Sequence, residues 1–467
     1  MDPFEFEDEQ NEDIREIVEK YEHAIRTNTS YFLDQEDFES LVEFYELKGE
    51  FNTALAVADQ ALEQHPFSSL LLIRKAQVEF ELKHCKEALE TLEKAELIDS
   101  SESGIYLLRA EIYTFLSRYT EAIDILEERL INASPEDLAD IHLQMADVYE
   151  DWEKYNDVFN CLRKCLQVDP ENEEALNRIN YCMEITEEYD RSRIFHEQLI
   201  DERPYSEFAW YNLSCAFKGL GRYNEAIDAL EYALAINEEL DFAYHDIAEL
   251  HIKNKDYAKA LEVLKDYESR FEADEEIYML KGQCHDAMQE YKLSRYYYKR
   301  ALHCNPNVAE AYYRIGESYK AEDNWKQAHQ FFIKAAEMEK QEYDYQIVAA
   351  ESAQVLQDVE KAIEIAEAAI DIAPTRFEAY ILMSHIFLQA GDADTAMEIL
   401  DKGILFCKST YELKFGRTAV LYYQGQRQEA MIQLLILISE APGKEIFMLY
   451  MYPEMENDPE IAAILSN

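Results

Sequence analysis

Two short groups of residues carry side chains that could do chemistry. Cys284, His285 and Asp286 are consecutive, and a thiol, an imidazole and a carboxylate are the groups that nucleophilic catalysis uses. His245 and Glu249 are four residues apart, so on a helix they share a face and could ligate a metal ion. Neither group has supporting residues of the right type, and no HExxH, Walker or GxSxG motif occurs. We therefore predict no catalytic residue, no metal and no cofactor, and a protein that is not an enzyme.

The elements that position these residues are set by a repeat. A mostly small residue recurs every 34 residues, with a single step of 36 between the third and the fourth copy. Such a period is typical of arrays in which each unit packs mainly on its neighbours. The recurring residues are Ala54, Ala88, Ala122, Val158, Ser192, Ala226, Ala260, Ser294, Ala328, Ala362, Ala396 and Ala430.

Numbering the recurring residue as position 20 sets the limits of twelve repeats. Residues 1–34 precede them and are expected to form an acidic tail, disordered to about residue 11, and a capping helix over about 12–27. Residues 445–467 follow and are expected to form capping helices that cover the open face of the last repeat. The repeats, predicted to form one uninterrupted array, span 35–68, 69–102, 103–136, 139–172, 173–206, 207–240, 241–274, 275–308, 309–342, 343–376, 377–410 and 411–444.

The apolar spacing within each repeat predicts two antiparallel amphipathic helices. Helix A is expected at about positions 2 to 14 and helix B at about 18 to 30. Position 8 is small in ten copies, as closely packed helices require, and position 17 is aromatic in eight. Proline at position 32 ends helix B in six copies.

This pattern resembles the tetratricopeptide repeat family. The sixth repeat matches it best, and the twelve repeats together account for 408 of the 467 residues. The resemblance implies an all-α fold, a right-handed superhelical α-solenoid of antiparallel helix pairs, in which helix A lines a concave groove and helix B the convex back. The matching residues of the sixth repeat are Trp210, Leu213, Ser214, Phe217, Gly221, Tyr223, Ala226, Leu230 and Ala233.

The charge of the chain excludes some partners. With 44 Lys and Arg against 97 Asp and Glu, the formal net charge is −53, which repels nucleic acid and anionic lipid. The N-terminus has no signal or transit features, and no apolar run is long enough to insert into a membrane. The eight cysteines form no CxxC pair, so reduced thiols in the cytoplasm are expected.

The groove that the resemblance implies is where a partner is expected. Position 9 of helix A is acidic in six of twelve repeats, and a stripe of carboxylates favours a basic segment. A solvated face on a protein that is acidic throughout remains an alternative reading. Tyrosine and arginine nearby are typical of binding hot spots, although helix packing would explain them equally well. The predicted partner-binding residues are Glu111, Asp147, Arg178, Tyr181, Tyr211, Asn212, Asp246, Glu249, Gln283, Tyr313, Arg314, Glu317 and Glu351.

Two known uses of this repeat are not predicted. The carboxylate clamp needs a lysine at position 5, which no repeat has, and an asparagine ladder needs position 6 asparagines, of which Asn212 is the single example. The sequence instead favours a non-enzymatic scaffold that binds an extended or helical segment of a protein partner in the groove. The alternatives are a structural assembly factor that self-associates through its terminal repeats, and an accessory that recruits substrate for a separate enzyme. The sequence leaves the oligomeric state open.

Overall fold

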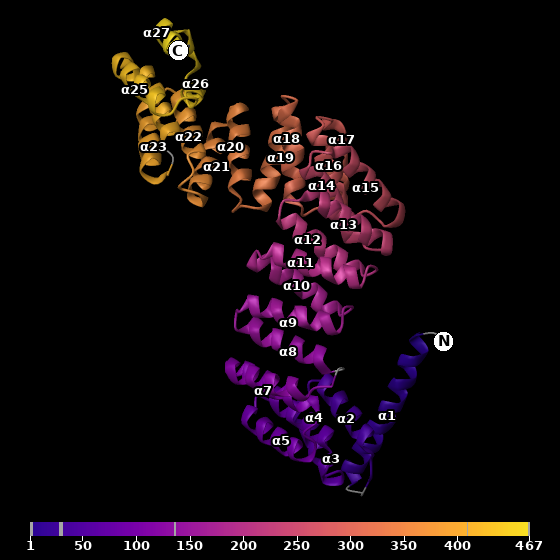
Figure 1. The fold of residues 1–467 in the computed structure, drawn as a ribbon. Coiled ribbons are helices and arrows are strands. Elements are labelled where there is room, and N and C mark those ends of the chain that lie inside the picture. Colours follow the sequence, from indigo (N-terminus) through magenta and orange to yellow (C-terminus); the bar gives the residue numbers. More distant parts are fainter. Residues whose placement is uncertain (1–2, 28–30, 135–136, 409, 466–467) are drawn as a thin grey trace. The chain divides into compact units, whose positions relative to one another are not determined.

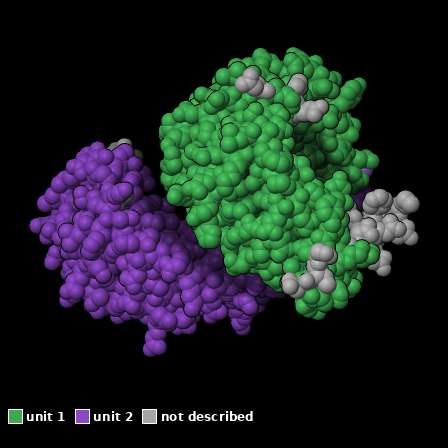
Figure 2. All heavy atoms as spheres, turned by 90° about the horizontal axis from the view of Figure 1, so that it is seen from below, with its two compact units in different colours: residues 1–243 green, residues 244–467 purple. Residues whose placement is uncertain are grey.

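The protein is an α-solenoid built of consecutive helix pairs (Figure 1). The computed structural model describes residues 3–27, 31–134, 137–408 and 410–465, and within these ranges it contains helices and no strand. The chain divides into two compact units, residues 1–243 and 244–467, which Figure 2 colours green and purple. The predicted all-α solenoid is confirmed.

The helices follow the repeat closely. The A helices of the first unit are α2 (Gln35–Leu47), α4 (Ser69–Glu81), α6 (Ser103–Phe115), α8 (Asp137–Asp151), α10 (Glu173–Thr186) and α12 (Glu207–Gly219). Its B helices are α3 (Phe51–Gln64), α5 (Cys85–Ile98), α7 (Tyr119–Asn132), α9 (Tyr155–Val168), α11 (Tyr189–Glu202) and α13 (Tyr223–Ile236).

The seventh repeat begins with α14 (Asp241–Lys253), which contains the limit between the units. The other A helices of the second unit are α16 (Glu275–Ala287), α18 (Ala309–Ala321), α20 (Tyr343–Val355), α22 (Glu378–Gln389) and α24 (Tyr411–Tyr423). Its B helices are α15 (Tyr257–Arg270), α17 (Tyr291–Cys304), α19 (Trp325–Met338), α21 (Val359–Ile372), α23 (Ala393–Phe406) and α25 (Arg427–Glu440).

The recurring residue at position 20 lies inside each helix pair. All twelve copies are at most 1% exposed. Position 8 lies where the two helices approach most closely: a Cβ added at Gly282 would lie 2.4 Å from the ring of Tyr298, and one at Gly316 would lie 2.5 Å from that of Phe332. The small residues of the pattern are therefore required by helix spacing.

Position 15 ends helix A with a left-handed residue in every repeat. The positive φ reverses the chain so that helix B can start two residues later. Only four of these twelve residues are glycine, so the sequence pattern gives little sign of the turn. The other eight are Lys83, Ser117, Glu153, Glu187, Lys255, Gln289, Asp323 and Gln357.

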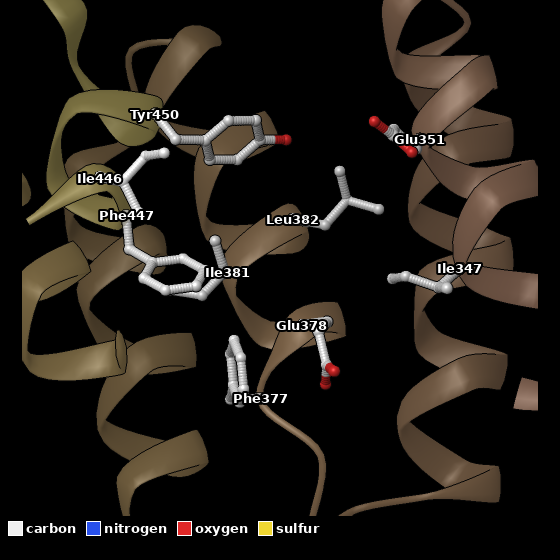
Figure 3. Close-up of a pocket in the computed structure, with 9 residues that line it drawn as sticks. All are labelled: Ile347, Glu351, Phe377, Glu378, Ile381, Leu382, Ile446, Phe447 and Tyr450. Carbon is white, nitrogen blue, oxygen red and sulfur yellow. The ribbon is translucent and has the colours of Figure 1, made fainter. Parts of the chain in front are cut away.

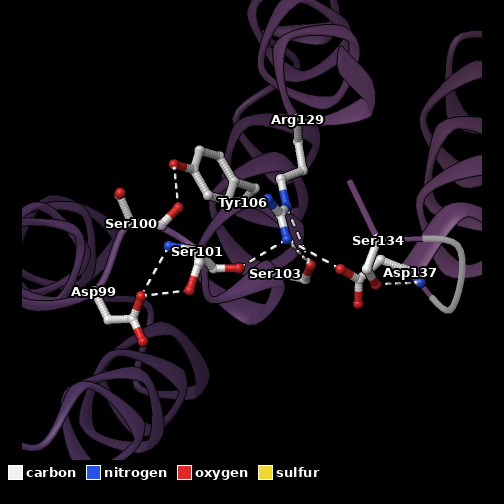
Figure 4. A network of polar contacts seen from close by, with 8 residues as sticks. All are labelled: Asp99, Ser100, Ser101, Ser103, Tyr106, Arg129, Ser134 and Asp137. Atoms are coloured by element: carbon white, nitrogen blue, oxygen red, sulfur yellow. Dashed lines mark hydrogen bonds and ion pairs between the residues drawn. The ribbon is translucent and has the colours of Figure 1, made fainter. Parts of the chain in front are cut away.

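The extra two residues between the third and fourth repeats are bridged by Arg129, whose side chain is 7% exposed (Figure 4). Its guanidinium donates to the carbonyl oxygen of Ser101 at 2.7 Å, to the hydroxyl of Ser103 at 2.7 Å and to Asp137 at 3.0 Å. The backbone N–H of Asp137 donates to the Ser134 hydroxyl, which is the hydrogen bond of a helix N-cap. One buried side chain thus joins α6, α7 and α8.

Helices also lie outside the twelve repeats at both ends of the chain. Helix α1 (Pro3–Thr27) starts before the capping helix expected over about residues 12–27. At the other end α26 (Ile446–Met451) packs mainly on the A helices α24 and α22, where an end cap would pack on α25. A 3₁₀ turn (Pro453–Asn457) and α27 (Pro459–Leu465) follow.

Candidate functional site

The A helices form the more tightly packed face of each unit. Contacts join A helices of successive repeats, including α2 with α4, α4 with α6, α10 with α12 and α20 with α22. In the described part of the chain no comparable contact joins B helices of successive repeats. Because the A helices are closer together than the B helices, the face that they line is the inner one. We call it the A-helix face.

In the first unit, a cluster of charges on the A-helix face is centred on Arg178. Its guanidinium lies 2.7 Å from Asp147, 2.7 Å from Glu150 and 2.8 Å from Glu174. Asp147 and Glu150 belong to α8 of the preceding repeat, so these pairs cross between repeats. One cation shared by three carboxylates leaves the cluster negative.

The carboxylates here are partly desolvated. Burial raises the pKa of Asp147, and Glu174 and Glu150 add to the rise while Arg178 opposes it. Burial also raises the pKa of Glu111 at position 9 of the preceding repeat, and the charges of Glu81 and Asp147 raise it further. Neighbouring carboxylates that raise one another's pKa form a site that a cation stabilises. Glu111 and Asp147, at position 9 of the third and fourth repeats, thus interact electrostatically.

Three other predicted residues of the first unit have different surroundings. Tyr181 is 55% exposed on α10, where a partner can reach it. The ring of Tyr211 contacts that of Phe242 edge to face, with centroids 4.8 Å apart. Asn212 is 3% exposed and its amide donates to the carbonyl oxygen of Leu176 at 2.8 Å. The Asn212 side chain is therefore committed to helix packing, which its position in the repeat did not reveal.

In the second unit a comparable group lies on α18 and α20. Lys320 is 2.7 Å from Glu351 of the next repeat, and burial raises the pKa of Glu317 against the opposing charge of Lys320. Arg314 pairs with Glu310 on its own helix at 3.0 Å. The Tyr313 ring lies 5.1 Å from that of Tyr345. Half-buried Gln283, on α16, belongs to neither group.

The residues first considered for catalysis are not arranged for it. Cys284 is fully buried, and burial raises the pKa of its thiol to about 12, so a thiolate nucleophile is disfavoured. His285 lies 2.7 Å from Glu290 and its ring stacks on Tyr297. Both contacts fix the imidazole against neighbouring side chains of the helix pair.

One group on α14 has side chains of metal-ligand type. His245, Asp246 and Glu249 place one ligand atom each within 4.8 Å of the others, which makes them the single such group in the part of the chain that the structure describes. His245 also lies 3.7 Å from Glu276 on α16. Partly exposed acidic side chains commonly gather without an ion, and these residues provide no closed coordination shell.

The A-helix face of the last three repeats carries the C-terminal segment. The ring of Phe447 packs edge to face on Phe377, with centroids 5.4 Å apart. The ring of Tyr450 lies 4.5 Å from that of His385, and its hydroxyl is 3.4 Å from the side chain of Gln354 on α20. Helix α26 therefore lies along the same face that carries the acidic groups of earlier repeats.

Beside α26 this face is hollow. A cavity of about 440 Å³ lies between α20, α22 and α26 (Figure 3). Seven of its nine lining side chains are apolar or aromatic, and the other two are Glu351 and Glu378. Nothing in the sequence singles it out. Ile73, Leu107 and Leu143 are also aliphatic at the repeat position of Ile347, and Leu108 and Leu280 are aliphatic at that of Leu382.

Comparison with known proteins supports the repeat assignment. Tetratricopeptide repeat models match residues 219–284, 356–405 and 139–172. A model of anaphase-promoting complex, cyclosome, subunit 3 matches residues 48–129. Anaphase-promoting complex subunit 3 of Schizosaccharomyces pombe is 22% identical over 255 residues, which cover 53% of this chain and 37% of that protein. The match thus spans little more than a third of the relative.

Solved structures with similar folds align with this chain at low TM-scores. A chain of the APC/C hetero-tetramer Cut9-Hcn1 aligns with 93% of this chain and 96% of its own, at 14% identity and a TM-score of 0.34. Yeast Tom70 aligns with 92% of this chain and 98% of its own, at 13% identity and a TM-score of 0.38. YrrB, described as having an unusual peptide-binding site, aligns over 39% and 95%, at 20% identity and a TM-score of 0.33. TM-scores this low support no further inference.

The helix pairs and their inner face define the class of the protein, an α-helical repeat scaffold with an extended surface. The register of the twelve repeats and the three matched segments then identify the family: the chain is a tetratricopeptide repeat protein. No helix among the described residues has the length and apolar character that spanning a membrane requires.

Proposed function

We propose that the chain is a non-enzymatic scaffold that binds a basic, extended or helical segment of a protein partner along its A-helix face. The observation that carries this proposal is the cluster in which Asp147, Glu150 and Glu174 of successive A helices share the single cation Arg178, with Glu111 of the preceding repeat interacting with Asp147. A lysine or arginine of the partner would relieve their mutual repulsion. The rigid repeats would place many such contacts in register at little entropic cost to the scaffold.

The matched sequence relative supports a role within an assembly. This Schizosaccharomyces pombe protein is by name a subunit of a complex. Cys161, Cys165 and Cys284 are buried thiols, which suits a reducing compartment, and we propose that the protein is cytoplasmic.

A photo-crosslinker placed on each face tests this function. Tyr181 on the A helix α10 and Tyr232 on the B helix α13 are 55% and 58% exposed, so they form a matched pair. Each is replaced with p-benzoylphenylalanine and irradiated in a lysate of the source organism. We expect a discrete adduct from position 181 only, and its loss in Glu111→Lys. The same adducts from both positions, or an adduct unaffected by Glu111→Lys, would contradict the proposal.

A second candidate function, self-association through the last repeat, is favoured by α25. Ile432, Leu435 and Ile436 are 61%, 54% and 50% exposed on its outer face. The corresponding residues of the eleventh repeat are Glu398, Asp401 and Lys402, and no earlier repeat is apolar at all three positions. Because each chain carries a net charge of −53, a stripe of exposed apolar side chains is where a second copy approaches at low electrostatic cost.

Sedimentation over a concentration series tests the second candidate. We expect the wild type to associate weakly and Leu435→Glu to remain monomeric at the same concentrations. Leu405→Glu is the control, since Leu405 is exposed on α23 outside this stripe. A wild type that is monomeric throughout, or a Leu435→Glu variant that associates as the wild type does, removes this candidate.

A further inference from the structure

The cavity between α20, α22 and α26 has the dimensions of a ligand site. Its volume of about 440 Å³ is large enough for a bulky side chain and falls within the usual size of binding pockets. In Figure 3 the side chains of Ile347 and Leu382 point into the space, and the hydroxyl of Tyr450 points across it towards Glu351. All of its lining residues belong to the second unit.

The walls are suited to an aromatic side chain. Phe377, Phe447 and Tyr450 contribute aromatic rings, Ile381 of α22 lies beside Phe447, and Ile347 of α20 lies on the opposite side of the space. Aromatic rings pack favourably on one another edge to face, as Phe447 already does on Phe377. A ring inserted here would pack against the aromatic rings that already line the cavity.

The rim is suited to a cation. Glu351 and Glu378 line the cavity, and no lysine or arginine does. Their basic partners, Lys320 at 2.7 Å from Glu351 and Arg376 at 3.0 Å from Glu378, are outside the set of lining residues. Both oxygens of Glu378 accept from Arg376, whereas Glu351 accepts from Lys320 through one oxygen. Glu351 is therefore the carboxylate that can accept from a further positive group.

Helix α26 shows what kind of segment this face accepts. It is a short helix rich in apolar and aromatic residues, and it lies on α22 and α24. Polar contacts fix the chain on both sides of it: Lys444 pairs with buried Glu412, and Asp458 accepts from Tyr422 at 2.7 Å and from Arg427 at 2.8 Å. The inner face of these repeats thus already binds one apolar segment, and the cavity lies beside it.

We propose that this cavity is a socket for a partner segment in which a phenylalanine, tyrosine or tryptophan is adjacent to a lysine or arginine. The ring enters between Leu382 and Tyr450, and the cation reaches Glu351. This inference rests on the proposed function as a scaffold, and it adds the side-chain chemistry that the tenth and eleventh repeats select.

Short peptides provide a direct test with the full chain. The probes are the amidated peptides Ac-Gly-Ser-Phe-Lys-Ser-Gly and Ac-Gly-Ser-Phe-Glu-Ser-Gly, with 4-fluorophenylalanine as the aromatic residue, titrated by ¹⁹F NMR. We expect the lysine peptide to bind about tenfold more tightly, because the glutamate peptide places a like charge beside Glu351 and Glu378. Equal affinities, or no binding of the lysine peptide, would overturn the proposal.

Three variants locate the binding. Ile347→Trp fills the cavity and should lower the affinity for the lysine peptide by about tenfold or more. Leu405→Trp, a matched change at a residue 82% exposed on α23, should leave the affinity unchanged. Glu351→Gln keeps the shape of the socket and should reduce the preference for lysine over glutamate. Circular dichroism confirms that each variant is folded.

The outcomes separate this inference from the proposed function. Unchanged binding to folded Ile347→Trp refutes the socket, whatever the crosslinking at position 181 gives. Crosslinking at 181 with no peptide binding refutes the socket and leaves the scaffold proposal standing. Peptide binding that Ile347→Trp abolishes, without crosslinking at 181, supports the socket. It refutes the proposal that the acidic A-helix face of the first unit binds a partner.

Discussion

The guanidinium of Arg178 lies 2.7 Å from the carboxylate of Asp147, a residue of the preceding repeat. This contact joins α8 to α10 and makes the charges of successive A helices one connected group. Because Glu150 and Glu174 share the same cation, Arg178 limits the repulsion among three carboxylates without cancelling their charge. The same residue therefore contributes to the stability of the stack and sets the charge that a partner meets.

Arg178→Gln should destabilise the helices around it. Removing the cation leaves three carboxylates close together, and we expect the free energy of local opening of α8 and α10 to fall by about 1–3 kcal/mol. Hydrogen exchange at pH 7.5 measures this loss. Arg193→Gln is the control, because Arg193 is equally shielded but pairs only with Asp190 and Glu197 on its own helix. Equal losses in the two variants would contradict the cross-repeat role of Arg178.

Arg129→Lys should loosen the junction between the third and fourth repeats. A lysine cannot reproduce the fan of donors that reaches Ser101, Ser103 and Asp137, and we expect a loss of about 1–3 kcal/mol. Increased deuterium uptake in residues 99–104 and 137–141 is the measurement. The control is Arg118→Lys, since Arg118 is about half exposed and pairs with Glu121 alone. Uptake that rises no more than in this control would show that the network is dispensable.

Two glycine-to-alanine changes should shift the free energy of unfolding in opposite directions. A methyl at Gly316 would lie 2.5 Å from the ring of Phe332, so Gly316→Ala should destabilise the ninth repeat by about 1–3 kcal/mol. At Gly104 the nearest atom is 3.6 Å away, so Gly104→Ala should stabilise α6 by up to about 1 kcal/mol. Thermal unfolding by calorimetry compares the two. Stabilisation by Gly316→Ala would mean that the helices of this repeat separate readily.

The C-terminal segment should loosen in acid because of His385. Burial lowers the pKa of this imidazole to about 4, and its Nδ1 lies 3.0 Å from the Gln354 amide. A histidine with a depressed folded-state pKa contributes stability above the unfolded value of about 6.5 and loses it as the pH falls towards 4. We expect a loss of about 1.4 kcal/mol per pH unit across this window.

His385→Phe tests this pH dependence. Phenylalanine keeps the ring contact with Tyr450 and cannot be protonated. Hydrogen exchange of α22 and α26 at pH 7.5 and 5.0 should show a smaller acid-induced loss in the variant than in the wild type. Parallel losses in the two proteins would place the acid sensitivity elsewhere.

Much of the fold could be predicted from the repeat. Every helix B begins at position 17, one residue before the predicted start, from Phe51 to Arg427. This agreement has a simple cause: each unit must bury the same apolar stripe on its neighbours, so the same spacing recurs in sequence and in space. The recurring residue at position 20 is buried in all copies for the same reason.

The candidate site could be predicted only in part. The acidic residues of position 9 were evident, and Glu111 and Asp147 lie on one connected face. The burial of Asn212 was not evident, because it depends on a carbonyl group 36 residues earlier. The left-handed residues at position 15 also escaped the pattern, since eight of them are side-chain-bearing residues that the turn forces into a strained conformation.

The sequence by itself determined the all-α class, the number of repeats and the register of every helix pair, because these follow from local apolar spacing. The tertiary structure decided which charges neutralise one another and where the C-terminal segment lies. Phe447 meets Phe377, a residue 70 positions earlier, across the inner face of two repeats. Such a contact depends on how neighbouring repeats stack, and no periodicity within a single repeat contains that information.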